Sequence, residues 1–316
     1  LLAILFCVTF LFSGCEDYLT HNLGDQLDVD KVFSNRNTTQ RFLAGVYGYL
    51  PTYYELYDQT MVPCSDEAYF NWTQWNPPYV SMNNGSYNPS TSTYQIWEKM
   101  YKAISQATTF IENVDKCLDV SETERATMKA EARFLRAYYY FQLFEHYGPV
   151  YVHGDVPSDL TIKGDDVDRH SVDQVVNFIS EELDKAAKDL PLTVQPAFYG
   201  RATKGVALAA KSRLTLYAAR PLFNGCDLYK GMKNMYGDYL FPQSPDPKKW
   251  DLAYEAAKDV MDLGVYGLYK SREGNTDFEK GAKSYMGVIF SKWNNEIIWG
   301  RWVDEAGIWN NIQRRS

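Results

Sequence analysis

Residues 124–152 read ERATMKAEARFLRAYYYFQLFEHYGPVYV, and this stretch decides the fold. Apolar side chains recur along it at steps of four and three, the period of one helical face turned towards a core. They are Ala130, Phe134, Ala137, Phe141 and Phe144. Gly148 and Pro149 follow, and such residues commonly end helices. The stretch therefore predicts the central helix of an all-α domain.

The same helix carries a run of tyrosines and several charges. Tyr138 to Tyr140 widen its apolar surface, so we expect it to pack on more than one side. Arg133 and Arg136 are three residues apart on one side, and Glu131 precedes them by two and five residues. We interpret Glu131 as able to pair with either arginine on the same helix.

The stretch also resembles the signature helix of the SusD/RagB family, the surface nutrient-binding lipoproteins of Bacteroidetes. Residues 130–137 read AEARFLRA, which is similar to the core motif of that family, and aromatic residues follow. The chain departs from the family pattern at residues 148–151, where it has Gly-Pro-Val-Tyr in place of a Tyr-Gly-Gly-Val-Pro-like exit. The resemblance implies a helical fold and a role in binding, with no catalysis expected.

The composition of the 316-residue chain limits the classes of partner. The net charge is −8, which argues against a nucleic-acid partner. The chain has 25 Tyr, 16 Phe and 8 Trp, more aromatic residues than a core requires. This excess suggests that aromatic side chains serve a surface or a ligand. Cys64, Cys117 and Cys226 are odd in number and far apart, so we expect buried free thiols and no disulfide framework.

The first residues resemble a lipoprotein export signal. Residues 1–12 form an uncharged apolar run that is too short to span a membrane and fits a signal-peptide h-region. Ser13, Gly14 and Cys15 follow, and they resemble a lipobox, in which the cysteine is acylated. We interpret residues 1–14 as an incomplete signal peptide and residues 15–34 as a lipidated tether anchored at Cys15. An ordinary signal peptide with an incidental cysteine is the alternative.

Residues 70–92, FNWTQWNPPYVSMNNGSYNPSTS, form the most unusual segment. Their Asn, Pro, Ser and Gly content predicts a loop, and loops of this length usually have a function. Trp72, Trp75 and Tyr79 offer aromatic faces for sugar rings, and Asn76 offers an amide for sugar hydroxyls. These four are the predicted ligand-binding residues. It is an equally good interpretation that the indoles pin the loop to the body of the protein.

Further helices are predicted at residues 35–50, 94–117, 171–190, 200–219 and 250–263. They recur in pairs, at a spacing typical of tetratricopeptide-like repeats with irregular loops between them. Residues 294–299 resemble a short family segment and are a candidate strand. We expect one SusD-like helical-repeat domain at residues 35–316, truncated at its C-terminus because members of the family are longer.

Nothing in the sequence has the arrangement of a catalytic or metal site. The four histidines are His21, His146, His153 and His170. None has a cysteine or glutamate at metal-ligand spacing, and no serine-hydrolase or zinc-protease motif occurs. We therefore predict no enzyme activity, no catalytic residue, no metal and no cofactor.

The resemblance implies a lipid-anchored subunit on the surface of the outer membrane. Such a subunit captures an oligosaccharide and delivers it to a SusC-like TonB-dependent barrel. Two alternatives stay open at this point. One is a RagB-like uptake protein that binds peptides, and the other is a helical-repeat scaffold that binds only protein.

Overall fold

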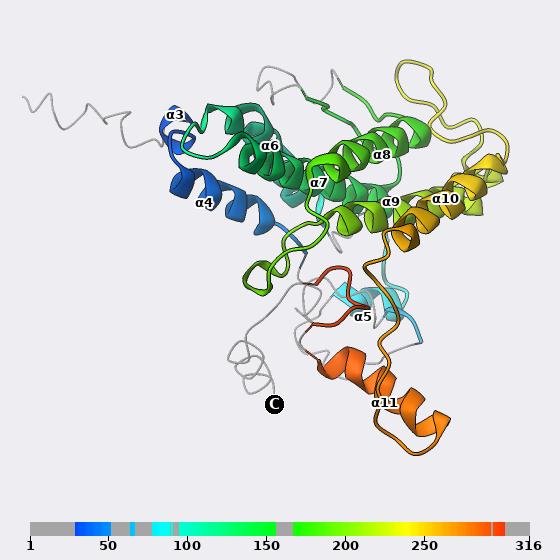
Figure 1. Ribbon diagram of the computed structural model, residues 1–316. Helices are drawn as coiled ribbons and strands as arrows, with labels where there is room; N and C mark the ends of the chain where they lie inside the picture. The colour runs from blue at the N-terminus through cyan, green and yellow to red at the C-terminus, as the bar shows by residue number, and fades with distance from the viewer. Residues whose placement is uncertain are drawn as a thin grey trace, which may run out of the picture.

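The computed structural model describes residues 29–51, 64–66, 78–88, 90, 95–155, 167–291 and 293–300. Within these residues the regular secondary structure is helical (Figure 1). Extended backbone pairs there only at an isolated antiparallel bridge between Lys233 and Tyr239. The predicted all-α fold class is therefore confirmed.

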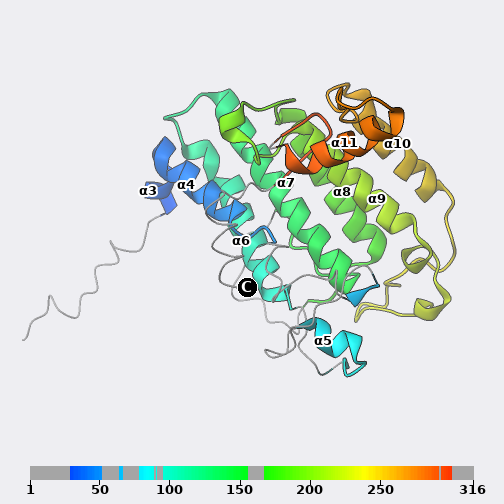
Figure 2. The same cartoon turned by 90° about the horizontal axis from the view of Figure 1, so that it is seen from below.

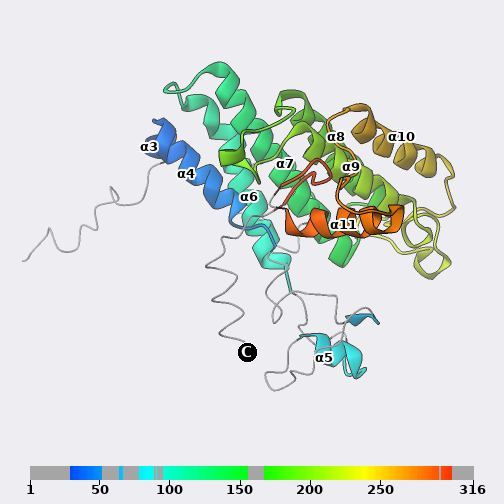
Figure 3. The ribbon, with the colours of Figure 1, turned by 60° about the horizontal axis from the view of Figure 1, so that its bottom comes forward.

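Six helices form the body of the protein: α4 (Arg36–Tyr47), α6 (Trp97–Asn113), α7 (Glu122–Tyr147), α8 (Val172–Asp189), α9 (Lys204–Ala219) and α10 (Lys248–Asp262). Helices α6 to α10 lie side by side in chain order, and each packs on the next (Figure 2). Helix α4 packs on α6 and α7 at the N-terminal end of this layer (Figure 3). The shorter helices α3 (Val29–Val32) and α5 (Pro78–Asn83), and α11 (Asp277–Phe290), complete the set of α-helices in the described residues.

The helix ends follow from local capping residues. The Asn35 side chain accepts a hydrogen bond from the Thr38 N–H and begins α4. Ser171 forms a capping box with Gln174 at the start of α8. Gly148 ends α7 with a φ of +71°, a conformation that glycine adopts without steric cost.

Three segments differ from their prediction. Helix α5 lies within residues 70–92, which were predicted to form a loop. The predicted strand at residues 294–299 is wrong, because Asn295 makes only a local pair of hydrogen bonds with Gly267 and no ladder follows. Helix α11 has no counterpart among the predicted helices. Its start is nevertheless visible in the sequence, since Thr276 and Glu279 form a capping box.

Helix α7 is the centre of the core. Phe134, Ala137 and Phe141, the middle of its predicted apolar face, are all buried. Tyr139 and Tyr140 are also buried, so α7 is covered on more than one side, as predicted. The Tyr140 hydroxyl accepts a hydrogen bond from the His153 N–H at 2.9 Å. Burial raises the pKa of this phenol to about 12.

The arginines of α7 do not pair within their own helix, so that prediction is wrong. Arg136 is fully buried and binds Glu182 of α8, whose side chain is 1% exposed. The same carboxylate accepts from Arg133 at 3.0 Å and from Lys185 at 3.0 Å. Glu131 lies on another face of α7 and binds Arg201 and Tyr47. The ion pairs therefore join α7 to α8.

Candidate functional site

Most of the predicted site residues lie outside the described residues. These are Trp72, Trp75 and Asn76 of the predicted loop and the predicted lipid anchor Cys15. Tyr79 lies in the short helix α5, and its side chain is only 3% exposed. A ring that is covered in this way is held by packing, and its contact with a ligand stays a prediction.

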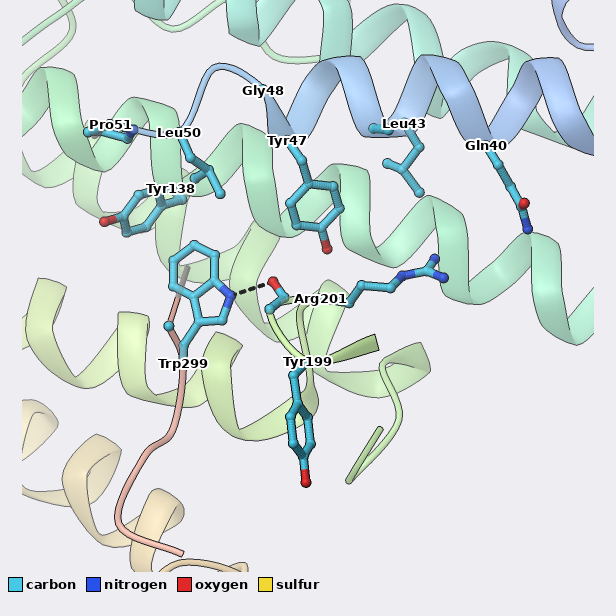
Figure 4. Close-up of a pocket in the computed structure, with 13 residues that line it drawn as sticks. Gln40, Leu43, Tyr47, Gly48, Leu50, Pro51, Tyr138, Tyr199, Arg201 and Trp299 are labelled. Atoms are coloured by element: carbon cyan, nitrogen blue, oxygen red, sulfur yellow. Dashed lines mark hydrogen bonds between the residues drawn. The ribbon is translucent and has the colours of Figure 1, made fainter. Parts of the chain in front are cut away.

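A pocket opens between α4, the turn at residues 199–201 and the segment at residues 299–300, and we call it the aromatic pocket (Figure 4). Its volume is about 680 Å³, within the usual range of small-molecule sites. The described residues that line it are Gln40, Leu43, Ala44, Tyr47, Gly48, Leu50, Pro51, Tyr138, Tyr199, Gly200, Arg201, Trp299 and Gly300. Side chains from α4 face Trp299 and Arg201 across the pocket.

One wall of the aromatic pocket rests on the buried carboxylate of Glu131, which is 2% exposed. Arg201 donates to it twice, from Nε at 3.0 Å and from Nη2 at 2.6 Å. The Tyr47 hydroxyl donates to the same carboxylate at 2.6 Å and accepts from the Ala202 N–H at 2.9 Å. Burial, reinforced by the charge of Glu131, raises the pKa of Tyr47 well above its usual value. The phenol therefore stays protonated and fixed as a donor.

The opposite wall is the indole of Trp299. Its Nε1–H donates to the Gly200 carbonyl oxygen at 2.8 Å (Figure 4). The indole meets the rings of Phe134 and Tyr138 edge to face, at centroid distances of 5.2 and 5.3 Å. Gly200 has a φ of +97°, which favours glycine in this turn. Trp299 thus ties its own segment to the turn and to the central helix.

An exposed aromatic surface lies at the rim of the pocket. The rings of Tyr199 and Trp293 stack at a centroid distance of 4.3 Å, with their planes 13° apart. The Tyr199 side chain lines the pocket and is 36% exposed. The stack fixes the orientation of the Tyr199 ring, which points away from Tyr47 and Trp299 (Figure 4).

Within the described part of the chain, no group of three or more His, Cys, Asp and Glu side chains is placed to hold a metal ion. The described cysteines are Cys64, Cys117 and Cys226, and within the described residues none of the three forms a disulfide. Of these, Cys117 is buried as predicted, whereas the other two are partly exposed and the prediction of their burial is wrong.

The sequence did not predict the aromatic pocket. Tyr47, Tyr138, Arg201 and Trp299 lie far apart in the chain, and no spacing rule connects them. The sequence held only an indirect signal for the pocket. Trp299 ends the candidate strand at residues 294–299, and a tryptophan side chain there is expected to pack against another part of the protein. Among the described helices, none is long and apolar enough to cross a membrane.

Comparisons of the sequence with known proteins find SusD-like proteins. A SusD-like family model, described as "Starch-binding associating with outer membrane", matches residues 23–216. The curated SusD-like protein P25 of Formosa agariphila is 22% identical over 305 residues, which cover 86% of this chain and 56% of that protein.

Two solved structures share the fold. BT4246 gives a TM-score of 0.73 at 24% identity, covering 86% of this chain and 51% of that one. A SusD-like protein (BF3747) from Bacteroides fragilis gives a TM-score of 0.68 at 22% identity, covering 90% and 48%. The present chain thus spans about half the length of the proteins that it matches.

Proposed function

This chain belongs to the SusD-like family, and from this premise we propose that it is a lipid-anchored protein of the outer membrane that captures a nutrient glycan. It delivers the glycan to a SusC-like TonB-dependent barrel and performs no catalysis itself. The observation that carries the proposal is the match of residues 23–216 to a family described as starch-binding and associated with the outer membrane.

The proposed contacts to the glycan are Trp72, Trp75 and Asn76, whereas Tyr79, which was predicted with them, is only 3% exposed and is assigned to packing. The aromatic faces stack on the C–H faces of sugar rings, and the amide bonds hydroxyls. Tryptophans that anchor a ligand are commonly hot spots, each contributing about 2 kcal/mol or more. A loss of about 2 kcal/mol weakens binding roughly thirtyfold, which is enough to abolish detectable binding of a weak glycan.

The test is retardation of the purified chain in gels that contain soluble starch, laminarin, xylan or pectin. We expect retardation by at least one polysaccharide and its loss in Trp72→Ala and in Trp75→Ala. The matched control is Trp250→Ala, because Trp250 lies on α10 and is 48% exposed. All three variants are expected to keep the wild-type circular dichroism spectrum and melting midpoint.

Other outcomes would change the proposal in defined ways. If both loop variants bind as well as the wild type, the contacts lie outside the loop. If they lose binding only together with their folded structure, the indoles are packing residues. If no polysaccharide retards the wild type but oligopeptides bind it saturably, the ligand is a peptide and the protein is an uptake protein of the RagB kind.

The proposed anchor is tested separately. Cys15→Ser is expected to move the protein from the outer-membrane fraction to the soluble fraction and to remove labelling by fatty acid, because several acyl chains on one cysteine hold a protein firmly to a bilayer. Cys226→Ser is the control, since Cys226 is a free and partly exposed cysteine within the folded body. If Cys15→Ser still sediments with membranes and takes up label, the anchor lies elsewhere.

A further inference from the structure

We propose that a groove between α7 and the end of α8, which we call the basic groove, binds the anionic phosphate groups of membrane lipids, so that this end of the protein rests on the bilayer surface. The inference rests on the proposed function, because it concerns how the lipid-anchored protein is held at the membrane. It is carried by the cations that gather in the groove and by the contacts that hold the start of the described chain beside it.

The basic groove has a volume of about 500 Å³ and is lined by more cations than carboxylates. The cations are Arg125, Lys129, Arg133, Lys185 and Lys188. Three carboxylates line the groove with them. The chain as a whole has a net charge of −8, so the groove differs in sign from the rest of the protein.

Three of the cations form a ridge along α7. Arg125, Lys129 and Arg133 recur every four residues, a spacing that places side chains on one face of a helix. Lys185 and Lys188 line the same groove from α8. Like charges that are gathered in this way repel one another, and an anion placed among them relieves the repulsion.

The neighbouring carboxylates are already shared or exposed. Glu182 binds Arg133 and Lys185 and also serves Arg136. Asp115 binds Lys129 at 2.5 Å, but its side chain is 63% exposed, and exposed ion pairs are weak. The groove therefore keeps positive charge that an additional anion can neutralise.

Two of the cations have no acidic partner. Within the described part of the chain, neither Arg125 nor Lys188 forms an ion pair with a carboxylate. The Arg125 guanidinium is nevertheless fixed in place, because its Nη1 donates to the carbonyl oxygens of Cys117 at 3.1 Å and Val120 at 2.9 Å. A guanidinium presents several N–H groups in one plane, which suits phosphate oxygens.

The groove lies at the end of the protein from which the chain runs towards the proposed anchor. Asp30 of α3 binds Lys116 at 2.6 Å, and Arg36 binds Glu124 at 2.8 Å. These pairs hold residues 29–36 against the segment that carries Asp115 and Arg125. Val29 follows Cys15 by 14 residues, which span at most about 50 Å when extended. An acylated Cys15 would therefore keep the groove close to the bilayer.

The experiment measures binding to vesicles without the contribution of the anchor. The purified Cys15→Ser chain is mixed with vesicles of phosphatidylcholine alone or of phosphatidylcholine with phosphatidylglycerol, and sedimentation gives the bound fraction. We expect binding to the vesicles that contain phosphatidylglycerol only, and we expect this binding to weaken as the salt concentration rises.

Variants in this background locate the site. Lys188→Gln and Arg125→Gln are each expected to weaken binding about fivefold, which corresponds to about 1 kcal/mol for each cation near an anionic membrane. Asp189→Asn removes a carboxylate that lines the groove, so it is expected to strengthen binding. The matched control is Lys258→Gln, the same change of charge at an exposed position of α10, and it is expected to leave binding unchanged. Lys188→Gln removes no ion pair of the described chain, so its melting midpoint should stay that of the background.

The possible failures are distinct. Equal weakening by Lys258→Gln and the groove variants would overturn the groove as the site, because net charge would then be the cause. Binding of inorganic phosphate without any binding of vesicles would overturn a lipid as the ligand. Absence of vesicle binding, with normal fatty-acid labelling of Cys15 and normal retardation by a glycan in the wild type, would overturn this inference and leave the proposed function intact. Absence of labelling and of retardation would overturn the proposed function and the membrane role of the groove with it.

Discussion

Replacement of Glu182 by alanine tests the ion cluster that joins α7 to α8. The Glu182 side chain is 1% exposed, and that of its partner Arg136 is fully buried. Breaking a buried ion pair from one side costs about 3–5 kcal/mol, because the other charge is left without its partner. Arg136 keeps one carboxylate, since its Nη2 also binds Asp155 at 2.6 Å. We therefore expect Glu182→Ala to lower the free energy of unfolding by about 3 kcal/mol, the lower end of this range.

The loss is measured by urea and thermal unfolding, followed by circular dichroism at the helical band. For a domain of this size, about 3 kcal/mol corresponds to a decrease of roughly 5 °C in the melting midpoint. The melting midpoint of Glu182→Gln is expected to lie between those of Glu182→Ala and the wild type, because glutamine has the size of glutamate and its amide keeps one acceptor oxygen. The control is Glu181→Ala, an exposed neighbour on the same helix, with an expected change within about 0.5 kcal/mol.

Equal midpoints for Glu181→Ala and Glu182→Ala would refute the reasoning. That result would mean that Glu182 is solvated and that Arg133 and Arg136 are neutralised by other groups. The sequence-based interpretation, in which these arginines pair with Glu131 on their own helix, leads to that result. The two accounts are therefore separated by one pair of variants.

Two other predictions concern pH and close packing. Burial lowers the pKa of His170, whose Nδ1 accepts the Val152 N–H at 3.1 Å. The unfolded chain then binds more protons, so the histidine's contribution to stability is complete above about pH 6.5 and is lost as the pH falls through the folded-state pKa. Urea midpoints at neutral and mildly acidic pH should differ more for the wild type than for His170→Asn, and equal differences would contradict this. In Gly205→Ala the new Cβ would overlap the hydroxyl oxygen and the ring of Tyr266. We expect a cost of about 1–3 kcal/mol in thermal unfolding, relieved in the double variant with Tyr266→Ala; a single variant as stable as the wild type would show that the tyrosine moves aside freely.

The helices were predictable because their signals are local. The apolar period of α7 involves residues three and four apart, and Gly148 directly follows the last residue of the helix, Tyr147. Ser171 and Gln174 cap α8 across a single turn. Helix α11 carries the same kind of local signal, because Thr276 and Glu279 form a capping box at its start.

The partners of buried side chains were not predictable in the same way. Glu131 was expected to bind Arg133 or Arg136, which are its neighbours in sequence, but it binds Arg201 and Tyr47. Spacing along a helix says which residues are close enough to pair. It does not say which residues another helix brings closer, or which pairs are shielded from water and so interact most strongly.

The sequence alone determined the all-α class, the central helix and the resemblance to the SusD/RagB family, because each depends on residues within a few positions of one another. Only the tertiary structure decided that α7 and α8 are joined through Glu182, and that Tyr47, Tyr199 and Trp299 surround one pocket. Those arrangements depend on how α4, α7 and the segments near residues 200 and 299 pack together. Packing of distant segments minimises exposed apolar surface and unpaired buried charge over the whole chain, and no local pattern records its outcome.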